Sequence, residues 1–445
     1  MKIFFCSLTW VAIVLLATII LQKSKADEFY ATRLAGTWTI TNVGVTPPYS
    51  TYTFNSLAIQ PNNHPAFVYH EYGAPIWEEN FQGWVPSGAP GKLRYAEFDG
   101  ISWTTTIVDD DGNTGFSNSL AFDSSGTPHI SYVNYSDDTL RYAKRVNGVW
   151  QKSTLEYIGP YTNPDGTAQL QMDTSATSLV INPATGTPTV SYLHQASYTY
   201  RYGVLDAGVF TSEPVEYIAS MPLKTLYPSE GRFLSHDLDG QGNPHLAYWT
   251  MNTEDGTSGL EYASKDAQGN WSKLIIDESG RTYYSDLKVG SDNVPRVAYY
   301  DELPIYPTVG VLKFAELTEL GWQSTIIDGG TPRDASDADV VGWHPSLALD
   351  ATDKPHVSYA DFSGEAIKYA TRSGGDWATE VIEEGTYMVG LMSSLAIDST
   401  GNIHVAYDPP VSPVPEPSTW LMGLAGVACS GWQVWWRRRR QPAGR

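Results

Sequence analysis

The stretch from Pro345 to Gly385 reads PSLALDATDKPHVSYADFSGEAIKYATRSGGDWATEVIEEG and decides the fold. It contains four short runs rich in alternating apolar residues: Ser346–Leu349, His356–Tyr359, Ala366–Ala370 and Trp377–Ile382. The turn signals Asp-Lys-Pro, Ser-Gly and Gly-Gly-Asp separate these runs. Runs of this length with β-branched and aromatic residues, punctuated by turn residues, predict a four-stranded antiparallel meander.

The same unit recurs along the chain. Its second run ends in a tyrosine at Tyr69, Tyr132, Tyr192, Tyr248, Tyr299, Tyr359 and Tyr407. Its third run carries an aromatic residue at Tyr95, Tyr142, Tyr202, Tyr262, Phe314 and Tyr369. Its fourth run opens with one at Trp103, Trp150, Phe210, Trp271, Trp322 and Trp377. A repeated four-stranded unit of this size predicts a β-propeller whose aromatic residues pack within and between the blades.

The two ends of the chain complete each other. Residues 29–38, FYATRLAGTW, align with residues 367–377, IKYATRSGGDW, if one gap is allowed. The chain therefore begins with the last two runs of a unit, and it ends with the first two, at 394–398 and 403–408. Joining these halves closes a ring and removes its exposed ends. We expect an all-β fold, a seven-bladed β-propeller of four-stranded antiparallel blades, over residues 27–409.

Residues 394–407, SLAIDSTGNIHVAY, resemble NHL-type propeller repeats and, more loosely, the Asp-box repeats of sialidase-like propellers. In an Asp-box the aspartate and the glycine are two positions apart, whereas Asp398 and Gly401 are three apart. The resemblance covers the blades and no site, so it implies a fold and not an activity.

The chain is strongly acidic, with 28 lysines and arginines against 49 aspartates and glutamates and a formal net charge of −21. Such a charge argues against binding to nucleic acid or to an anionic membrane surface, and it suits a solvated exported surface. The two cysteines, Cys6 and Cys429, lie in terminal hydrophobic segments. The central domain therefore has neither a disulfide nor thiol chemistry. Separately, we expect the protein to be a monomer.

Residues 1–26 have the pattern of a secretory signal peptide. Lys2 supplies a positive charge, an apolar stretch runs from Ile3 to Leu21, and Ser24-Lys25-Ala26 offers small residues at the cleavage point. We expect cleavage by signal peptidase after Ala26, with an uncleaved N-terminal anchor as the alternative.

The C-terminus combines three features in order. A proline-rich linker at 410–417 carries Pro415, Glu416 and Pro417, an apolar stretch covers 418–436, and a basic tail at 437–445 opens with Arg437, Arg438, Arg439 and Arg440. An apolar stretch of roughly 20 residues can cross a bilayer, and arginines beyond it hold that end in the cytoplasm. We expect a transmembrane helix at 418–436, with the propeller on the other side of the inner membrane.

This order of features resembles the PEP-CTERM sorting signal of Gram-negative bacteria. The resemblance implies recognition by an exosortase, with Pro415, Glu416 and Pro417 as recognition residues. It further implies that the helix anchors the protein in the membrane before processing, and that the product then reaches the cell surface or the extracellular matrix. An ordinary C-terminal anchor is the alternative.

No catalytic motif stands out from the repeat. Four of the nine histidines, His129, His245, His356 and His404, occupy one repeated position, which predicts hydrogen bonds within the blades. Five basic residues also share one position of the third run: Arg94, Arg141, Arg201, Lys313 and Lys368. There is no nucleophile elbow, phosphate-binding loop or zinc-type spacing. We therefore assign no catalytic residue and no metal ligand, and we favour a protein that is not an enzyme.

Function is expected where the chain departs from the repeat. The longest departure, residues 70–92, holds Trp77, Phe81 and Trp84, and a shorter loop adds Tyr306. Aromatic side chains in polar loops suit stacking on sugar rings, and the alternative is that they cover their own blade. Acidic loops such as 109–111 could bind Ca²⁺, although solvated loops are favoured. No other cofactor is expected.

These observations predict a non-catalytic binding module for extracellular polysaccharide, and that class of ligand is implied by the PEP-CTERM resemblance alone. The competing hypothesis is a secreted carbohydrate-active enzyme, a sialidase-like glycoside hydrolase or a lyase, which would need carboxylates and arginines that converge at the mouth of the central channel. A third hypothesis is a structural surface protein, which needs neither an aromatic platform nor such a cluster.

Overall fold

The computed structural model describes a large central part of the chain. The described residues are 29–43, 55–71, 76–78, 83–85, 90–159, 161–162, 168–169, 177–197, 199–217, 234–251, 258–278, 281–303, 309–329, 339–385 and 392–407. All of them belong to one unit, residues 25–410. The expected signal peptide, linker, transmembrane helix and basic tail lie outside the described residues. Among the described residues, no helix is long and apolar enough to cross a membrane.

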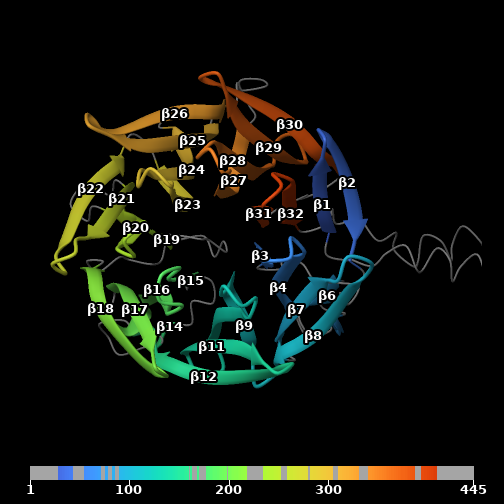
Figure 1. Cartoon of the computed structure of the whole chain (residues 1–445), viewed down its shortest axis with the longest axis vertical. Helices are drawn as coiled ribbons and strands as arrows, with labels where there is room; N and C mark the ends of the chain where they lie inside the picture. The colour runs from blue at the N-terminus through green and yellow to red at the C-terminus, as the bar shows by residue number, and fades with distance from the viewer. Residues whose placement is uncertain are drawn as a thin grey trace, which may run out of the picture. The chain divides into compact units, whose positions relative to one another are not determined.

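The strands form antiparallel sheets arranged around a ring (Figure 1). One four-stranded sheet contains β3 (Asn55–Ile59), β4 (Pro65–Glu71), β7 (Lys92–Phe98) and β8 (Trp103–Asp109). The next contains β9 (Thr114–Phe122), β10 (Pro128–Asn134), β11 (Thr139–Val146) and β12 (Val149–Tyr157). A third contains β15 (Thr177–Ile181), β16 (Pro188–His194), β17 (Thr199–Asp206) and β18 (Val209–Tyr217). A fourth contains β19 (Leu234–Leu238), β20 (Pro244–Met251), β21 (Ser258–Lys265) and β22 (Trp271–Asp277).

The next eight strands form one continuous sheet. Its first half contains β23 (Arg281–Val289), β24 (Pro295–Leu303), β25 (Val309–Thr318) and β26 (Gly321–Gly329). Its second half contains β27 (Asp339–Leu349), β28 (Pro355–Asp361), β29 (Ala366–Ser373) and β30 (Asp376–Glu384). Within each half, consecutive strands pair antiparallel, as in the separate sheets. The halves join through a short parallel pairing of β25 with β27, at Val309↔Asp339 and Gly310↔Val340.

This continuous sheet corrects the expected number of sheets. Seven separate four-stranded sheets were expected, whereas five are separate and the other eight strands are fused. The reason is the length of β27, which has 11 residues where β3 and β31 have five, so that its first residues reach β25.

The fifth separate sheet closes the ring. It runs in the order β2 (Thr37–Asn42), β1 (Phe29–Leu34), β32 (Ile403–Tyr407) and β31 (Ser393–Ile397), so the two N-terminal strands form one half of the sheet and the two C-terminal strands form the other half (Figure 1). β1 and β32 pair antiparallel from Phe29↔Tyr407 to Arg33↔Ile403. The expected pairing of N-terminal with C-terminal strands is therefore confirmed.

The core lies between neighbouring sheets. One cluster, for example, packs Leu260 and Tyr262 of β21 against Leu287 of β23 and Val297 and Tyr299 of β24. The seven repeated tyrosines of the second strands are at most 1% exposed. Their interpretation as packing residues is confirmed.

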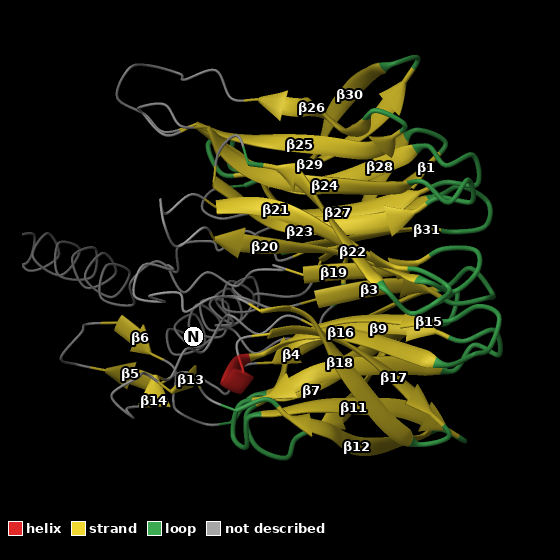
Figure 2. Cartoon of the chain, turned by 90° about the vertical axis from the view of Figure 1, so that its left-hand side faces the viewer, coloured by secondary structure: helices red, strands yellow, loops and turns green. Residues whose placement is uncertain are grey.

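The ring has two different faces (Figure 2). Most of the short turns gather on one side, which we call the turn face. On the other side, the loop face, lie the short hairpins β5 (Ile76–Glu78) with β6 (Gly83–Val85) and β13 (Tyr161–Thr162) with β14 (Ala168–Gln169), together with the 3₁₀ helix η1 (Gln195–Ser197). The two hairpins come from a loop between second and third strands and from a loop between sheets, so these two kinds of loop lie on the same face.

Candidate functional site

The aromatic residues predicted to bind sugar are described only in part. Trp77 and Trp84 face each other as Cα partners in the β5–β6 hairpin on the loop face, and their side chains are not described. Phe81 and Tyr306 lie outside the described residues, as do the sorting residues Pro415, Glu416, Pro417 and Arg437–Arg440. The aromatic platform and the sorting signal therefore stay predictions.

The repeated histidines hold the blades together, as the sequence predicted. Nδ1 of His129 lies 2.5 Å from the Tyr142 hydroxyl, and its Nε2 lies 3.3 Å from Asp123 Oδ2. The same arrangement recurs for His245 with Tyr262 and Asp239, for His356 with Tyr369 and Asp350, and for His404 with Tyr30 and Asp398. Burial lowers the pKa of His129, which favours a neutral imidazole. These histidines are structural.

The basic residues of the third strands also have structural partners. Lys313 Nζ lies 2.9 Å from Asp277 and 2.6 Å from Asp301, and the Tyr299 hydroxyl donates to Asp277 at 2.6 Å. Asp277 ends β22, so this cluster links two neighbouring sheets. Equivalent clusters join Lys368 and Tyr359 to Asp328, and Arg141 and Tyr132 to Asp109. These three cations therefore have equivalent structural partners in three units.

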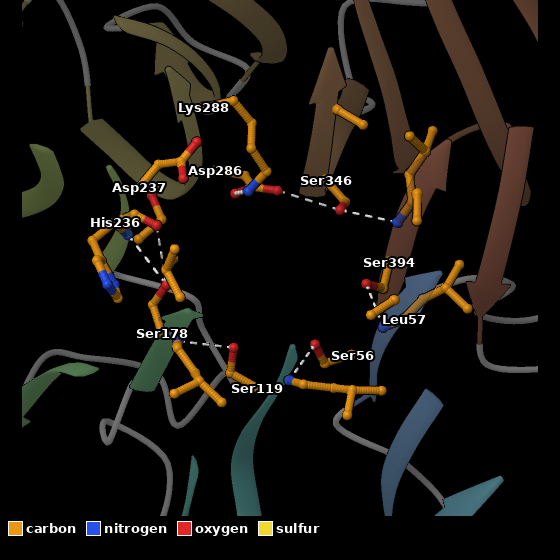
Figure 3. A pocket seen from close by; sticks show the side chains of 18 of the residues that line it. Ser56, Leu57, Ser119, Ser178, His236, Asp237, Asp286, Lys288, Ser346 and Ser394 are labelled. Atoms are coloured by element: carbon orange, nitrogen blue, oxygen red, sulfur yellow. Dashed lines mark hydrogen bonds and ion pairs between the residues drawn. The ribbon is translucent and has the colours of Figure 1, made fainter. Parts of the chain in front are cut away.

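The first strands of the units surround a central channel with a cavity of about 470 Å³. At one level of this channel, a side-chain oxygen from each first strand accepts a hydrogen bond from a backbone amide of the next first strand, over 2.8 to 3.2 Å (Figure 3). The accepting residues, in chain order, are Ser56, Ser119, Ser178, Ser235, Asp286, Ser346 and Ser394. We call this set the channel ring.

Sequence reasoning missed the channel ring, although it left a signal. The first run of most units opens with Ser-Leu-Ala or a close variant, as at residues 56–58, 346–348 and 394–396. The alternation of buried and exposed residues along a strand explains the leucine of this triplet but not the serine. The recurrence of serine before it was the available sign of a second, polar function.

The channel departs from this repeat in one sector. The triplet becomes Ser235-His236-Asp237 in β19 and Asp286-Leu287-Lys288 in β23. Lys288 Nζ lies 3.0 Å from Asp286 Oδ1, while Asp237 Oδ2 accepts the Val289 amide at 2.9 Å. Figure 3 shows these charged side chains grouped on two adjacent strands of the channel wall. We call His236, Asp237, Asp286 and Lys288 the polar sector.

Burial sets the protonation of the polar sector. His236 is 1% exposed and hydrogen-bonds with the hydroxyls of Thr189 and Ser191, each at 3.0 Å, and burial lowers its pKa to about 3. It is therefore neutral at pH 7. Desolvation raises the pKa of Asp237, and Lys288 opposes that rise. The polar sector thus contains the Lys288 ammonium group and the carboxyl groups of Asp237 and Asp286, which have different environments. The serine hydroxyls of the channel ring surround them.

The described residues include no group of three or more His, Cys, Asp or Glu side chains that could hold a metal ion. In the acidic loop at 109–111, Asp109 is fully buried and forms ion pairs with Arg141 and Lys152. Its carboxylate is therefore already neutralised by the protein.

Comparisons with known proteins give no family. No family model matches the chain, and no curated protein matches it. Among solved structures, a putative 6-phosphogluconolactonase from Bacteroides uniformis is 11% identical, with a TM-score of 0.46 over 87% of this chain and 99% of that one. A polysaccharide lyase, an ulvan lyase bound to an oligosaccharide, is 12% identical, with a TM-score of 0.45 over 76% and 84%.

An α-L-arabinanase from Penicillium chrysogenum, complexed with arabinobiose, is 10% identical, with a TM-score of 0.42 over 66% of this chain and 93% of that one. These identities and TM-scores are too low to transfer an activity or a ligand to this chain.

Proposed function

We propose that this protein is a non-catalytic binding module for extracellular polysaccharide and that the central channel holds the ligand. The observation that carries the proposal is the channel ring together with the polar sector. A serine oxygen that accepts a backbone amide can still donate its own hydroxyl proton. Ser178 and Ser346 donate theirs within the channel wall, to the His236 carbonyl and to Asp286, so the donors available to a ligand come from the other ring serines. The channel therefore combines several hydroxyl donors with the Lys288 ammonium and the Asp237 carboxyl group, which suits recognition of many sugar hydroxyls.

The bonding of the carboxylates supports binding over catalysis. A glycosidase needs one carboxyl group as an acid and a second as a base or nucleophile. Asp286 Oδ2 accepts from the Leu347 amide and from Ser346, and its Oδ1 pairs with Lys288. Both oxygens are thus engaged, Oδ2 in the channel ring and Oδ1 with Lys288.

A second candidate function is a carbohydrate-active enzyme, a glycoside hydrolase or a lyase. One observation favours it: the raised pKa of Asp237 is the property of a general acid. Among the described residues that line the cavity there is no arginine to clamp an acidic substrate. We therefore rank the enzyme second.

We further propose that the chain is exported, processed by signal peptidase, and sorted to the cell surface by an exosortase. The support is the sequence of residues 1–26 and the Pro-Glu-Pro, apolar and arginine segments of 415–440. We also propose that each half of the eight-stranded sheet acts as a blade of its own, which gives a seven-bladed ring. The seven members of the channel ring support this count.

The test of the channel is a glycan screen on the purified mature chain that records both binding and products. Polysaccharide binding without products, weakened by Asp237→Asn and by Lys288→Met, supports the module. Products that are lost in Asp237→Asn favour the enzyme. Binding that survives both channel variants but is lost in Trp77→Ala and Trp84→Ala would move the site to the loop face and overturn the channel assignment.

A further inference from the structure

Six junctions between neighbouring units are filled by the same aromatic contact. In each, a tryptophan of a fourth strand packs edge to face on an aromatic ring in the third strand of the preceding unit, with centroids 5.1 to 5.9 Å apart. The pairs are Trp103 with Tyr30, Trp150 with Tyr95, Trp271 with Tyr202, Trp322 with Tyr262, Trp377 with Phe314 and Trp38 with Tyr369.

The seventh junction, between the sheets β9–β12 and β15–β18, is built differently. Phe210 stands where the other units have tryptophan, and its ring packs on its own sheet, with its centroid 6.1 Å from that of Tyr192. A Cβ atom added to Gly203 would lie 2.3 Å from Phe210 Cζ. The other units have alanine in place of Gly203, for example Ala143 and Ala263. Gly203 therefore makes room for Phe210 to turn away from Tyr142.

A groove of about 710 Å³ opens at this junction. One wall contains Lys144, Gln151 and Ser153, and the other contains the turn around Thr187 and residues 205–208. These elements belong to the turn face, opposite the hairpins β5–β6 and β13–β14. Every residue that lines the groove is a described residue.

The ion pair that bridges two of the other junctions is also missing here. Glu97 of β7 binds Arg145 of β11 through two bonds of 2.8 and 2.7 Å, and Glu316 binds Arg372 at 3.0 Å in the same way. At the groove, Lys144 occupies the position of Glu97, and Leu205 occupies that of Arg145. In the described part of the chain, no carboxylate lies within ion-pair distance of Lys144. Lys144 thus has no ion-pair partner among the described residues, although Asp123, which is bonded to Ser125 and His129, and Asp206 also line the groove.

We propose that this groove binds a sugar residue that carries a carboxylate, that is, a uronic acid within a glycan. The ligand carboxylate would supply the negative charge that Glu97 and Glu316 supply elsewhere. Gln151, Ser153 and Thr187 offer donors and acceptors for sugar hydroxyls. Pro188 and Leu205 offer an apolar wall for the C–H face of the ring. The inference rests on the proposed polysaccharide-binding function, but it uses a site separate from the channel.

The experiment titrates the mature protein with trigalacturonate and with the neutral galactose trisaccharide, followed by calorimetry. The wild type should bind trigalacturonate at least about tenfold more tightly than the neutral sugar, because a charge-assisted hydrogen bond is stronger than a neutral one. Lys144→Met should remove this preference. Phe210→Trp should restore the contact with Tyr142, close the groove and abolish binding while the protein stays folded.

Two controls separate the groove from the rest of the protein. Lys354→Met alters a lysine in the turn between β27 and β28 on the same face, and Asp237→Asn alters the channel. Lys354→Met should leave trigalacturonate binding unchanged, and Asp237→Asn should leave the preference for trigalacturonate over the neutral sugar unchanged. If trigalacturonate does not bind, or if its binding survives Lys144→Met, the inference is wrong, even if polysaccharide binding through the channel is found. Conversely, Lys144-dependent binding with no effect of channel variants on any glycan would retain the groove and reject the channel.

Discussion

The side-chain oxygen of Ser394 accepts the backbone amide of Leu57 at 2.9 Å, across 337 residues of sequence. This bond joins β31 of the closing sheet to β3 of the next sheet and completes the channel ring. One layer further out, β1 and β32 pair along five residues. The two ends of the described chain are therefore tied together both around the channel and within a sheet.

Removal of residues 27–43 should abolish cooperative folding. It deletes both β1 and β2, exposes the edge of β32, and uncovers the cluster in which Ala31 packs against Tyr369 and Tyr407. Thermal unfolding followed by circular dichroism is the measurement. A chain that ends at residue 410 is the control, since it keeps every described strand. Cooperative melting at an unchanged temperature in the truncated protein would contradict the closure.

Ser346→Ala should lower the free energy of unfolding by about 1–3 kcal/mol, because it leaves the buried Leu395 amide without its acceptor. Ser346 is 2% exposed and accepts that amide at 3.0 Å. Urea denaturation provides the measurement. Ser399→Ala in an exposed turn is the control and should change stability by less than about 0.5 kcal/mol. Equal stability of the two variants would mean that the channel ring contributes nothing.

The parts of the fold that repeat were visible in the sequence. Residues such as Tyr299 and His129 recur at fixed positions, so their alignment alone indicated packing and hydrogen bonding within the blades. The fusion of β25 with β27 could not be foreseen, because it depends on how far β27 extends in three dimensions. The same holds for the direction of the Phe210 ring, which Gly203 decides from a neighbouring strand.

The candidate site was harder to predict than the fold. A strand pattern tells which side chains point inward, but it does not tell that inward-facing serines from distant units meet at one level of a channel. The change from Ser-Leu-Ala to Ser235-His236-Asp237 becomes meaningful only when the units are superposed. The residues that sequence reasoning preferred, such as Trp77 and Phe81, have side chains that are not described.

Trp377→Ala should reduce the free energy of unfolding by about 2–4 kcal/mol, through loss of apolar burial and of the ring contact with Phe314 at 5.1 Å. Trp377 is only part-buried, so the expected cost is smaller than for a core tryptophan. Trp377→Phe keeps an aromatic ring and should cost less than half as much in guanidinium unfolding. A near-neutral alanine variant would show that this contact does not stabilise the junction.

Stability should fall as the pH decreases from about 6.5 toward 4, because two buried histidines stay neutral in the folded protein. Burial lowers the pKa of His70 to about 4 and that of His236 to about 3. The unfolded chain therefore binds more protons in this range, and each histidine costs up to about 1.4 kcal/mol per pH unit. These two histidines do not reduce the free energy of unfolding above pH 6.5. They reduce it progressively as the pH falls from 6.5 toward their pKa values in the folded protein.

His236→Gln is the variant that tests this account. It should be less stable at pH 7, because the pair of bonds to Thr189 and Ser191 is disturbed. Its stability should nevertheless change less between pH 6.5 and 5, by about 1–2 kcal/mol, in urea titrations at a series of pH values. The depressed carboxylates do not blur this window: the pKa of Asp123 and that of Asp350 are lowered to about 2, so these groups cost stability only near and below pH 4. An unchanged slope in the variant would mean that His236 is already protonated in the folded protein.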